Sequence, residues 1–207
     1  MSQSESVYGY VPNPLLARLN NLFWEYRLGI STRGIVNVDH PDSYHYATMF
    51  YSTIRKILDF MQLQPADVLV DIGSGKGRVL CCAALHPIRK VVGVDLSEEF
   101  CKHARINADN MRGRRSPIEI HNRVAQEFDY AQGTAFTLFN PFGASTLDAV
   151  LTKIRHDTIA SGRPVRFAYA NPVHESIFRN HQWLEKYASW DREQKQMEHS
   201  VIFYCSR

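Results

Sequence analysis

The stretch DIGSGKG, residues 71–77, has the residue types of a ligand-binding turn and lies between two apolar runs. Its three glycines let the backbone adopt left-handed conformations and come close to a bound molecule. Asp71 at its start and Asp95 further along are carboxylates, which accept hydrogen bonds and attract positive charge. Such a turn could bind a phosphate, a dinucleotide or a cationic ligand, and the spacing of these residues distinguishes the three.

The spacing excludes the phosphate-binding loop of the nucleoside triphosphatases. That loop reads G-x-x-x-x-G-K-[ST]. If Gly75 and Lys76 were its Gly-Lys pair, position 70 would be glycine and position 77 serine or threonine. The chain has Val70 and Gly77 there.

The dinucleotide pattern G-x-G-x-x-G, followed by an acid about 20 residues later, is met only in part. Gly73, Gly75 and Asp95 fit it, but Arg78 stands where the third glycine belongs. Asp71 would also face the pyrophosphate, and like charges repel. A carboxylate at that place suits a ligand that carries an ammonium and a sulfonium group. A nicotinamide-dependent dehydrogenase remains an alternative, which thermal stabilisation by NAD would detect.

The residues Asp71 to Gly77, with Asp95 at the end of the next strand, resemble the first two motifs of the class I S-adenosylmethionine-dependent methyltransferases. DIGSGKGR is also similar to the protein lysine methyltransferases outside the SET class. The resemblance implies S-adenosyl-L-methionine as cofactor and S-adenosyl-L-homocysteine as product. It implies that Asp71 binds the methionine amino group, directly or through water, that Asp95 binds both ribose hydroxyls, and that Leu96 borders the adenine. The other cofactor contacts that it implies are Gly73, Ser74, Gly75, Gly77, Asn140 and Thr48.

The adenine end departs from the family pattern. Many members have an acid directly after the third strand, whereas here HNRVAQEFDY, residues 121–130, has none at that place. We therefore expect the adenine contact from the backbone at Val124 or Ala125, or from Glu127. The missing acid also keeps open a non-catalytic protein that binds the cofactor.

LFNPFG, residues 138–143, resembles the Asn-Pro-aromatic element that several methyltransferase groups place after the fourth strand. The resemblance implies a catalytic role for Asn140, Pro141 and Phe142. Asn140 offers an acceptor and two donors that could orient a nucleophilic nitrogen, and Phe142 could stack on a planar group or lie near the sulfonium. An ordinary turn is the alternative interpretation.

DSYHYATMF, residues 42–50, contains a second group of candidates. In related methyltransferases, aromatic and hydroxyl residues ahead of the core cover the cofactor. This implies contacts from Tyr44, Tyr46 and Thr48. His45, and His174 elsewhere in the chain, are candidate bases because each stands near the expected end of a loop. Aromatic residues that only pack on the core are the alternative.

The order of elements indicates how these residues are positioned. Short apolar runs predict five buried strands, each before a helix or loop, and residues 183–190 and 200–205 predict an antiparallel pair. We therefore predict an α/β protein, a Rossmann-like three-layer sandwich whose mostly parallel seven-stranded sheet has an antiparallel C-terminal strand. Ligands bind such sheets at the carboxyl ends of the strands, where the candidate residues of the core stand. The five predicted strands are residues 67–72, 90–96, 117–123, 134–140 and 164–171.

Residues 1–64 are predicted to form a helical extension or lid on a cofactor-binding core, residues 65–207. Helical spacing predicts helices over residues 13–28 and 47–61. The first helix could cap the substrate pocket or form a docking face for a partner, and both interpretations stay open. Its regularly spaced apolar residues are Leu15, Leu16, Leu19, Leu22, Phe23 and Tyr26.

The composition narrows the function further. Of 207 residues, 44% are hydrophobic and 22% charged, which fits a globular domain, and a net charge of +3 is too small to indicate nucleic-acid binding by itself. None of the four cysteines forms a C-x-x-C pair, so no metal site is predicted. No secretory signal or bilayer-length apolar run is present, so a cytoplasmic protein without membrane contact is expected.

The basic residues of MRGRRS, residues 111–116, with Arg105 and Arg123, could contact RNA, but a solvated loop is the favoured interpretation. We expect methyl transfer by in-line displacement to a small molecule or a protein side chain, at nitrogen rather than oxygen. RNA or DNA methylation is the alternative within the enzymes.

Overall fold

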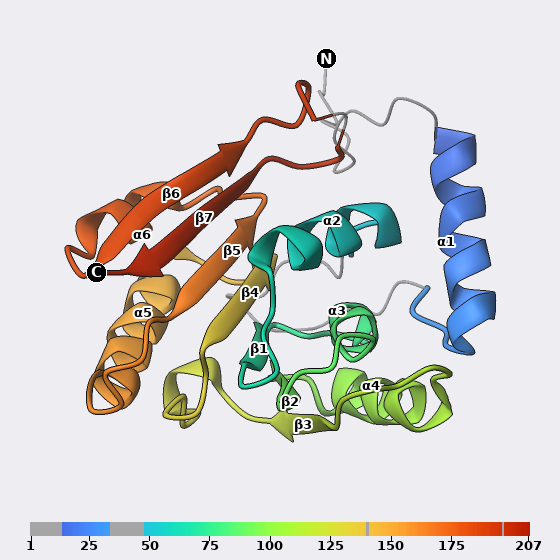
Figure 1. Cartoon of the computed structure of the whole chain (residues 1–207), viewed down its shortest axis with the longest axis horizontal. Coiled ribbons are helices and arrows are strands. Elements are labelled where there is room, and N and C mark those ends of the chain that lie inside the picture. The colour runs from blue at the N-terminus through green and yellow to red at the C-terminus, as the bar shows by residue number, and fades with distance from the viewer. Residues whose placement is uncertain (1–13, 34–47, 140, 196) are drawn as a thin grey trace, which may run out of the picture.

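The computed structural model describes residues 14–33, 48–139, 141–195 and 197–207, which form a three-layer α/β sandwich (Figure 1). The sheet has seven strands in the order β3-β2-β1-β4-β5-β7-β6. All are parallel except β7, which runs antiparallel to both β5 and β6. The strands are β1 (Val68–Ile72), β2 (Lys90–Asp95), β3 (Ile118–Asn122), β4 (Ala135–Phe139), β5 (Arg166–Ala170), β6 (Leu184–Trp190) and β7 (Val201–Ser206).

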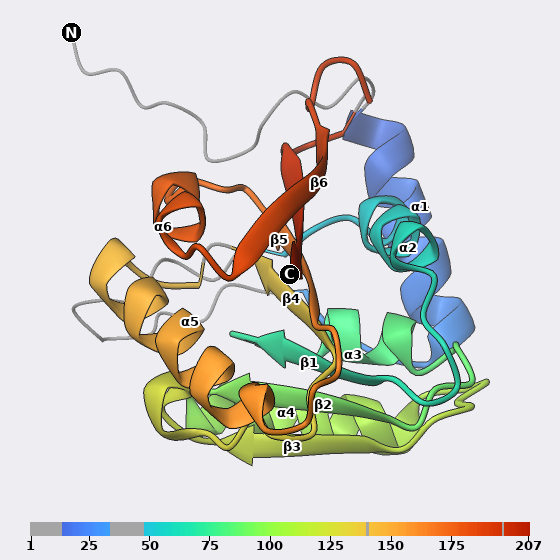
Figure 2. The ribbon, with the colours of Figure 1, turned by 60° about the vertical axis from the view of Figure 1, so that its left-hand side comes forward.

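Helices cover both faces of this sheet (Figure 2). One face carries α1 to α4, and the other carries α5 and α6. The predicted fold class and the antiparallel C-terminal strand are therefore confirmed. The helices are α1 (Pro14–Leu28), α2 (Tyr51–Met61), α3 (Arg78–Ala83), α4 (Glu98–Asn110), α5 (Ala144–Ile159) and α6 (Glu175–Asn180), and the 3-10 turn η1 is Ala125–Glu127.

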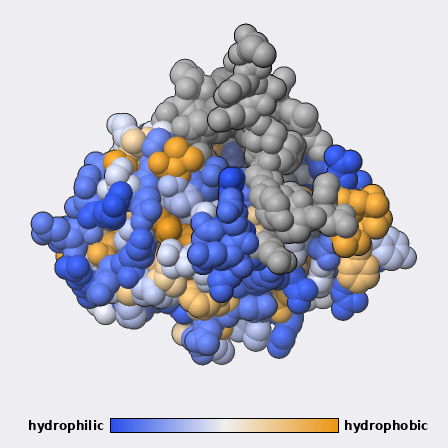
Figure 3. All heavy atoms as spheres, turned by 90° about the horizontal axis from the view of Figure 1, so that it is seen from above, coloured by the Kyte–Doolittle hydropathy of each residue, from blue (hydrophilic) through white to orange (hydrophobic). Residues whose placement is uncertain are grey.

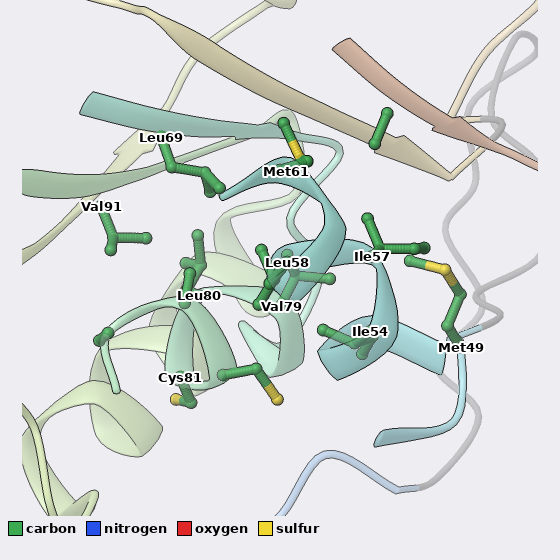
Figure 4. Close-up of a cluster of buried hydrophobic side chains, with 14 of the residues drawn as sticks. Met49, Ile54, Ile57, Leu58, Met61, Leu69, Val79, Leu80, Cys81 and Val91 are labelled. Atoms are coloured by element: carbon green, nitrogen blue, oxygen red, sulfur yellow. The ribbon is translucent and has the colours of Figure 1, made fainter. Parts of the chain in front are cut away.

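Alternation along β1 divides its side chains between two cores. Val68, Val70 and Ile72 pack with α5 and α6. Leu69 points to the other face and joins residues of α2 and α3 (Figure 4). Asp71 has the same parity as Leu69, so its carboxyl group lies on the face that carries α2 and α3.

The helix predicted from residue 47 begins at Tyr51, with Phe50 as its N-cap residue. Its first turn is capped from a distant part of the chain. The Phe50 N–H donates to Glu198 Oε1 (2.6 Å) and Thr53 Oγ1 donates to Glu198 Oε2 (2.5 Å). A carboxylate at a helix N-terminus satisfies unpaired backbone donors. This cap also attaches the segment before β7 to α2.

The described part of the chain has no helix that is both long enough and apolar enough to cross a membrane. Within that part, no cluster of three or more metal-ligating side chains occurs. Cys81, Cys82 and Cys101 are buried and free.

Candidate active site

The site is built around Asp71, the last but one residue of β1. Asp71 as a whole residue is only 5% exposed. Thr137, its partner in the register of β4, donates a hydrogen bond from Oγ1 to Asp71 Oδ1 at 2.6 Å. Burial raises the pKa of Asp71 to about 7; the Thr137 hydrogen bond opposes this rise, and the nearby Asp95 charge adds to it. A buried carboxylate of this kind is stabilised by a cation that binds beside it.

The turn after Asp71 is held against the end of β2. The N–H groups of Gly73 and Ser74 both donate to the Val94 carbonyl, at 2.9 and 3.2 Å. The Gly75 N–H donates to Asp95 Oδ2 at 2.7 Å. These bonds bring the glycine turn and the second acid together at the carboxyl edge of the sheet, as the sequence predicts.

Asp95 is oriented but not saturated by the chain. The Ser97 N–H donates to Oδ1 at 2.9 Å, so each carboxylate oxygen accepts one backbone hydrogen bond. A carboxylate offers about four acceptor positions, which leaves about two for a ligand. Burial raises the pKa of Asp95, and the two N–H donors oppose this rise. A pair of neighbouring hydroxyls, such as those of a ribose, fits the remaining capacity.

Two further features show how tightly the turn is packed. Ser74 is 6% exposed, and its Oγ has no hydrogen-bond partner among the described residues. Gly73 has a positive φ of 77°, and a Cβ added there would lie 2.5 Å from Pro141 Cβ. The turn therefore contacts the segment after β4 so closely that only glycine fits at position 73.

Gly77 packs against a helix, whereas Gly73 packs against the segment after β4. Its φ is 81°, and an added Cβ would point toward Ala104 of α4 at 3.2 Å. It is the N-cap of α3. This glycine allows α3 to pack closely on α4, so the contact that the structure gives it is to a helix.

The two cations of the motif point toward the N-terminal segment. Lys76 is buried and donates from Nζ to the Arg33 carbonyl at 2.8 Å. Arg78 donates to Thr32 Oγ1 (2.7 Å) and the Met49 carbonyl (2.8 Å). The hydrogen bonds of these two side chains therefore connect residues 32–33 and 49 to the glycine turn.

A buried ion pair reinforces this connection. Arg78 and Glu25 of α1 are each 4% exposed and approach to 3.5 Å. Glu25 Oε1 also accepts hydrogen bonds from the Thr32 N–H (3.0 Å) and from Thr32 Oγ1 (2.9 Å). The Arg78 guanidinium lies over the Tyr51 ring, 4.6 Å from its centroid. The inner face of α1 is thereby attached to the candidate cofactor loop.

Comparisons with known proteins agree with this geometry. The family model "Histone methylation protein DOT1" matches residues 38–133, which include the glycine turn, Asp71 and Asp95. A protein-lysine N-methyltransferase of Saccharolobus islandicus (strain REY15A) is 28% identical over 89 residues. That match covers 42% of this chain and 53% of the relative, so the chain spans about half the length of the relative that it matches.

Solved structures show the same fold. An RNA methyltransferase from Salinibacter ruber in complex with S-adenosyl-L-homocysteine superposes with a TM-score of 0.56 at 22% identity, over 77% of this chain and 94% of that one. A SAM-dependent O-methyltransferase from Thermotoga maritima gives a TM-score of 0.57 at 17% identity, over 78% of this chain and 67% of that one. At these identities the superpositions show that the chain has the fold of the class I methyltransferases.

Among the residues predicted from the class I methyltransferase motifs, those at the adenine end are half-buried or exposed. Leu96 follows β2 and is 44% exposed. Ala125 begins η1, and its carbonyl accepts a hydrogen bond from Tyr130 Oη at 2.7 Å. Glu127 is exposed at the end of η1. These three residues follow β2 and β3, on the same edge as Asp95.

Several predicted residues of the acceptor side lie outside the described residues, namely Asn140, His45, Tyr46 and Tyr44. Pro141 lies against Gly73, and Phe142 is half-buried and packs on the core under α5. Thr48 is half-buried, next to Met49, whose carbonyl binds Arg78. His174 stands at the N-cap of α6, after β5.

Sequence reasoning missed His199. β7 runs antiparallel, so the residues before it lie at the edge where β4 and β5 end, and His199 packs on Phe139 with ring centroids 4.8 Å apart. Burial lowers the pKa of His199 to about 4, with a contribution from Arg192, so its imidazole is neutral at physiological pH. The only signal in the sequence was its place just before an antiparallel strand.

The arginine loop, residues 111–117, lies at the opposite edge of the sheet. It precedes β3, so it stands at the amino ends of the parallel strands. Arg114 donates to the Ala108 carbonyl at 3.2 Å near the end of α4, and the Arg112 N–H donates to the Leu28 carbonyl at 2.7 Å. Arg112 and Arg114 therefore stabilise this loop, which is remote from the candidate site.

Proposed function

We propose that the chain is an S-adenosylmethionine-dependent methyltransferase that methylates the amino group of a lysine side chain in a protein. The observation that carries the proposal is the buried Asp71 carboxylate, which stands beside a glycine turn tied to a second, incompletely saturated carboxylate, Asp95. The two acids match an ammonium group and a ribose at opposite ends of one cationic ligand.

Asp71 would bind the amino group of the donor. In its protonated form this group carries the positive charge that a buried carboxylate needs beside it. Asp95 would accept hydrogen bonds from the ribose hydroxyls, with its orientation set by the N–H groups of Gly75 and Ser97. Gly73 lets the backbone approach, and Leu96 would cover the adenine. Bound in this way, S-adenosylmethionine supplies a methyl group that is already activated by its sulfonium.

The residues after β4 would then receive the acceptor. An amine attacks only in its neutral form: its lone pair forms the bond to the methyl carbon, the electrons of the broken bond return to sulfur, and a proton passes to water. The half-buried Phe139 and the neutral His199 that packs on it form apolar or uncharged surroundings, which would lower the pKa of an ammonium group. Alignment and exclusion of water are then the main contributions of the chain.

A protein lysine is favoured as acceptor by two matches. One is the family model named for histone methylation, and the other is the relative named a protein-lysine N-methyltransferase. An RNA or DNA acceptor would draw on a basic surface near the donor. The arginine loop stands at the far edge of the sheet, and of the basic residues named above Arg123 follows β3 on the donor side.

The test is to incubate the purified chain with cell extract and a donor labelled with tritium in its methyl group. We expect label in protein, recovered as methyl-lysine after hydrolysis. Label confined to RNA, DNA or small metabolites would contradict the lysine acceptor while leaving methyl transfer intact.

Calorimetry with S-adenosylmethionine and S-adenosylhomocysteine tests the donor site separately. Asp95→Ala should weaken both ligands strongly, whereas Asp109→Ala, which removes an exposed carboxylate on α4, should not. Unchanged affinity in Asp95→Ala would contradict the ribose assignment. Asn140→Ala should reduce turnover more than donor affinity, and full turnover in that variant would contradict its catalytic role.

A further inference from the structure

Helix α1 is attached to the core by a side that carries both polar and apolar residues. Glu25 forms the buried pair with Arg78, and Asn21 Oδ1 accepts a hydrogen bond from the Tyr51 N–H at 3.2 Å. Trp24 stacks on the Tyr51 ring, with centroids 6.5 Å apart. The inner face therefore combines an ion pair, a hydrogen bond and aromatic packing with the buried Leu28, which joins the hydrophobic core.

The opposite side of α1 presents a continuous apolar surface to solvent. Leu15, Leu19, Leu22 and Tyr26 recur at intervals of four, three and four, so they form one stripe along the helix, and Phe23 lies beside it. All five side chains are well exposed to solvent: Leu15 by 66%, Leu19 by 52%, Leu22 by 42%, Phe23 by 55% and Tyr26 by 80%. We call these five residues the α1 face; in Figure 3 a hydrophobic patch lies over this helix, at the right of the view.

We propose that the α1 face is a homodimer interface, in which α1 of one copy packs antiparallel on α1 of a second copy. The five side chains expose on the order of 600 Å² per copy, so a symmetric pair would bury about 1,200 Å², the lower end of specific interfaces. An isologous contact of this kind needs one self-complementary surface and no second protein. The inference does not depend on the proposed activity.

The distribution of side chains selects the antiparallel arrangement. The leucines Leu15 and Leu19 occupy the first half of the stripe, and the aromatic residues Phe23 and Tyr26 occupy the second half. Antiparallel packing places Leu15 opposite Tyr26 of the second copy. The leucine half of each helix then packs on the bulkier aromatic half of the other. The same arrangement also places Arg18 near the second copy's Phe23 rather than near another Arg18, which avoids a like-charge pair and permits a cation–π contact.

The first experiment measures the mass of the full chain in solution by sedimentation or light scattering, from about 1 to about 100 µM, where interfaces of this size dissociate. We expect a concentration-dependent rise from 23.8 kDa toward twice that mass. Leu19→Glu should abolish the rise. Ile106→Glu, at a 55% exposed position on α4, is the matched control and should leave it unchanged.

A second experiment tests the orientation. Leu15→Cys and Tyr26→Cys chains, mixed under oxidising conditions, should form the heterologous disulfide in preference to either homologous one, since two Leu15 positions would be about 16 Å apart along antiparallel helices. A monomeric wild type at the highest concentration, whatever else covers the α1 face, would overturn the proposal. So would a dimer that persists in Leu19→Glu. Predominant linkage of Leu15→Cys to itself would overturn the antiparallel arrangement.

Discussion

Replacing Asp71 by asparagine should stabilise the free protein above neutral pH and abolish tight donor binding at the same time. The pKa of this carboxyl rises from 3.8 to about 7 because it is buried. Asparagine has nearly the same shape, keeps an oxygen for the Thr137 hydroxyl, and carries no charge to bury. Stability and binding therefore change in opposite directions.

The sign of the stability change follows from proton linkage. Between pH 3.8 and about 7, the folded state keeps a proton on Asp71 that the unfolded state has lost, so the free energy of unfolding falls as pH rises through this window. Each pKa unit corresponds to about 1.36 kcal/mol, so ionised Asp71 lowers the stability of the free protein by about 4 kcal/mol above pH 7. Between pH 5 and pH 8, the stability advantage of Asp71→Asn over wild type should grow by about 3 kcal/mol.

Thermal and urea unfolding at these two pH values measure this advantage. For a chain of this length, about 3 kcal/mol corresponds to roughly 6–12 °C in Tm. Asp109→Asn, at an exposed position, is the control and should track wild type. If wild type and Asp71→Asn keep the same pH dependence, the reasoning about the buried carboxylate is wrong.

Calorimetry on the same two proteins tests the link to the donor. An ammonium group beside Asp71 lowers the pKa of that carboxyl, so wild-type affinity for S-adenosylhomocysteine should fall as pH drops below 7, approaching tenfold per unit. Asp71→Asn should bind more weakly and show no such dependence. A variant that binds as tightly as wild type at pH 8 would refute the ammonium contact.

Three other substitutions test the contacts around this carboxylate. Thr137→Val removes the hydrogen bond that opposes the rise in the pKa of Asp71. The pH below which donor affinity falls should therefore be higher than in wild type. An unchanged pH profile would contradict the effect of this bond. Gly73→Ala forces a Cβ against Pro141 at positive φ and should lower the free energy of unfolding by roughly 2 kcal/mol, measured in urea, and weaken donor binding. Arg78→Met removes the buried guanidinium beside Glu25, which keeps its ion pair with Arg33 at 2.5 Å, and should cost about 2 kcal/mol. Adding Glu25→Gln should restore part of this loss in a double-mutant cycle, and additive effects would show that Arg78 and Glu25 are not coupled.

The sheet and the donor side of the site were predictable because their signals are local. Alternation along β1 and the glycines after it depend on the backbone of a few consecutive residues, and the predicted strands agree with the observed ones within two residues at each end. Asp95 was predictable because parallel neighbouring strands end at the same edge. The short helix α6, with six residues, has too little periodicity to be recognised.

The sequence by itself determined that α1 is amphipathic and that DIGSGKGR is a turn before a helix. Only the tertiary structure decided that Lys76 and Arg78 bind the N-terminal segment and that His199 stands beside Phe139. It also decided that the side of α1 with Glu25 faces the core while its leucine stripe faces solvent. The physical reason is that φ angles and strand alternation are set by neighbouring residues. The partner of a buried charge, by contrast, is set by which distant side chain is packed within reach, and no spacing along the chain records that distance.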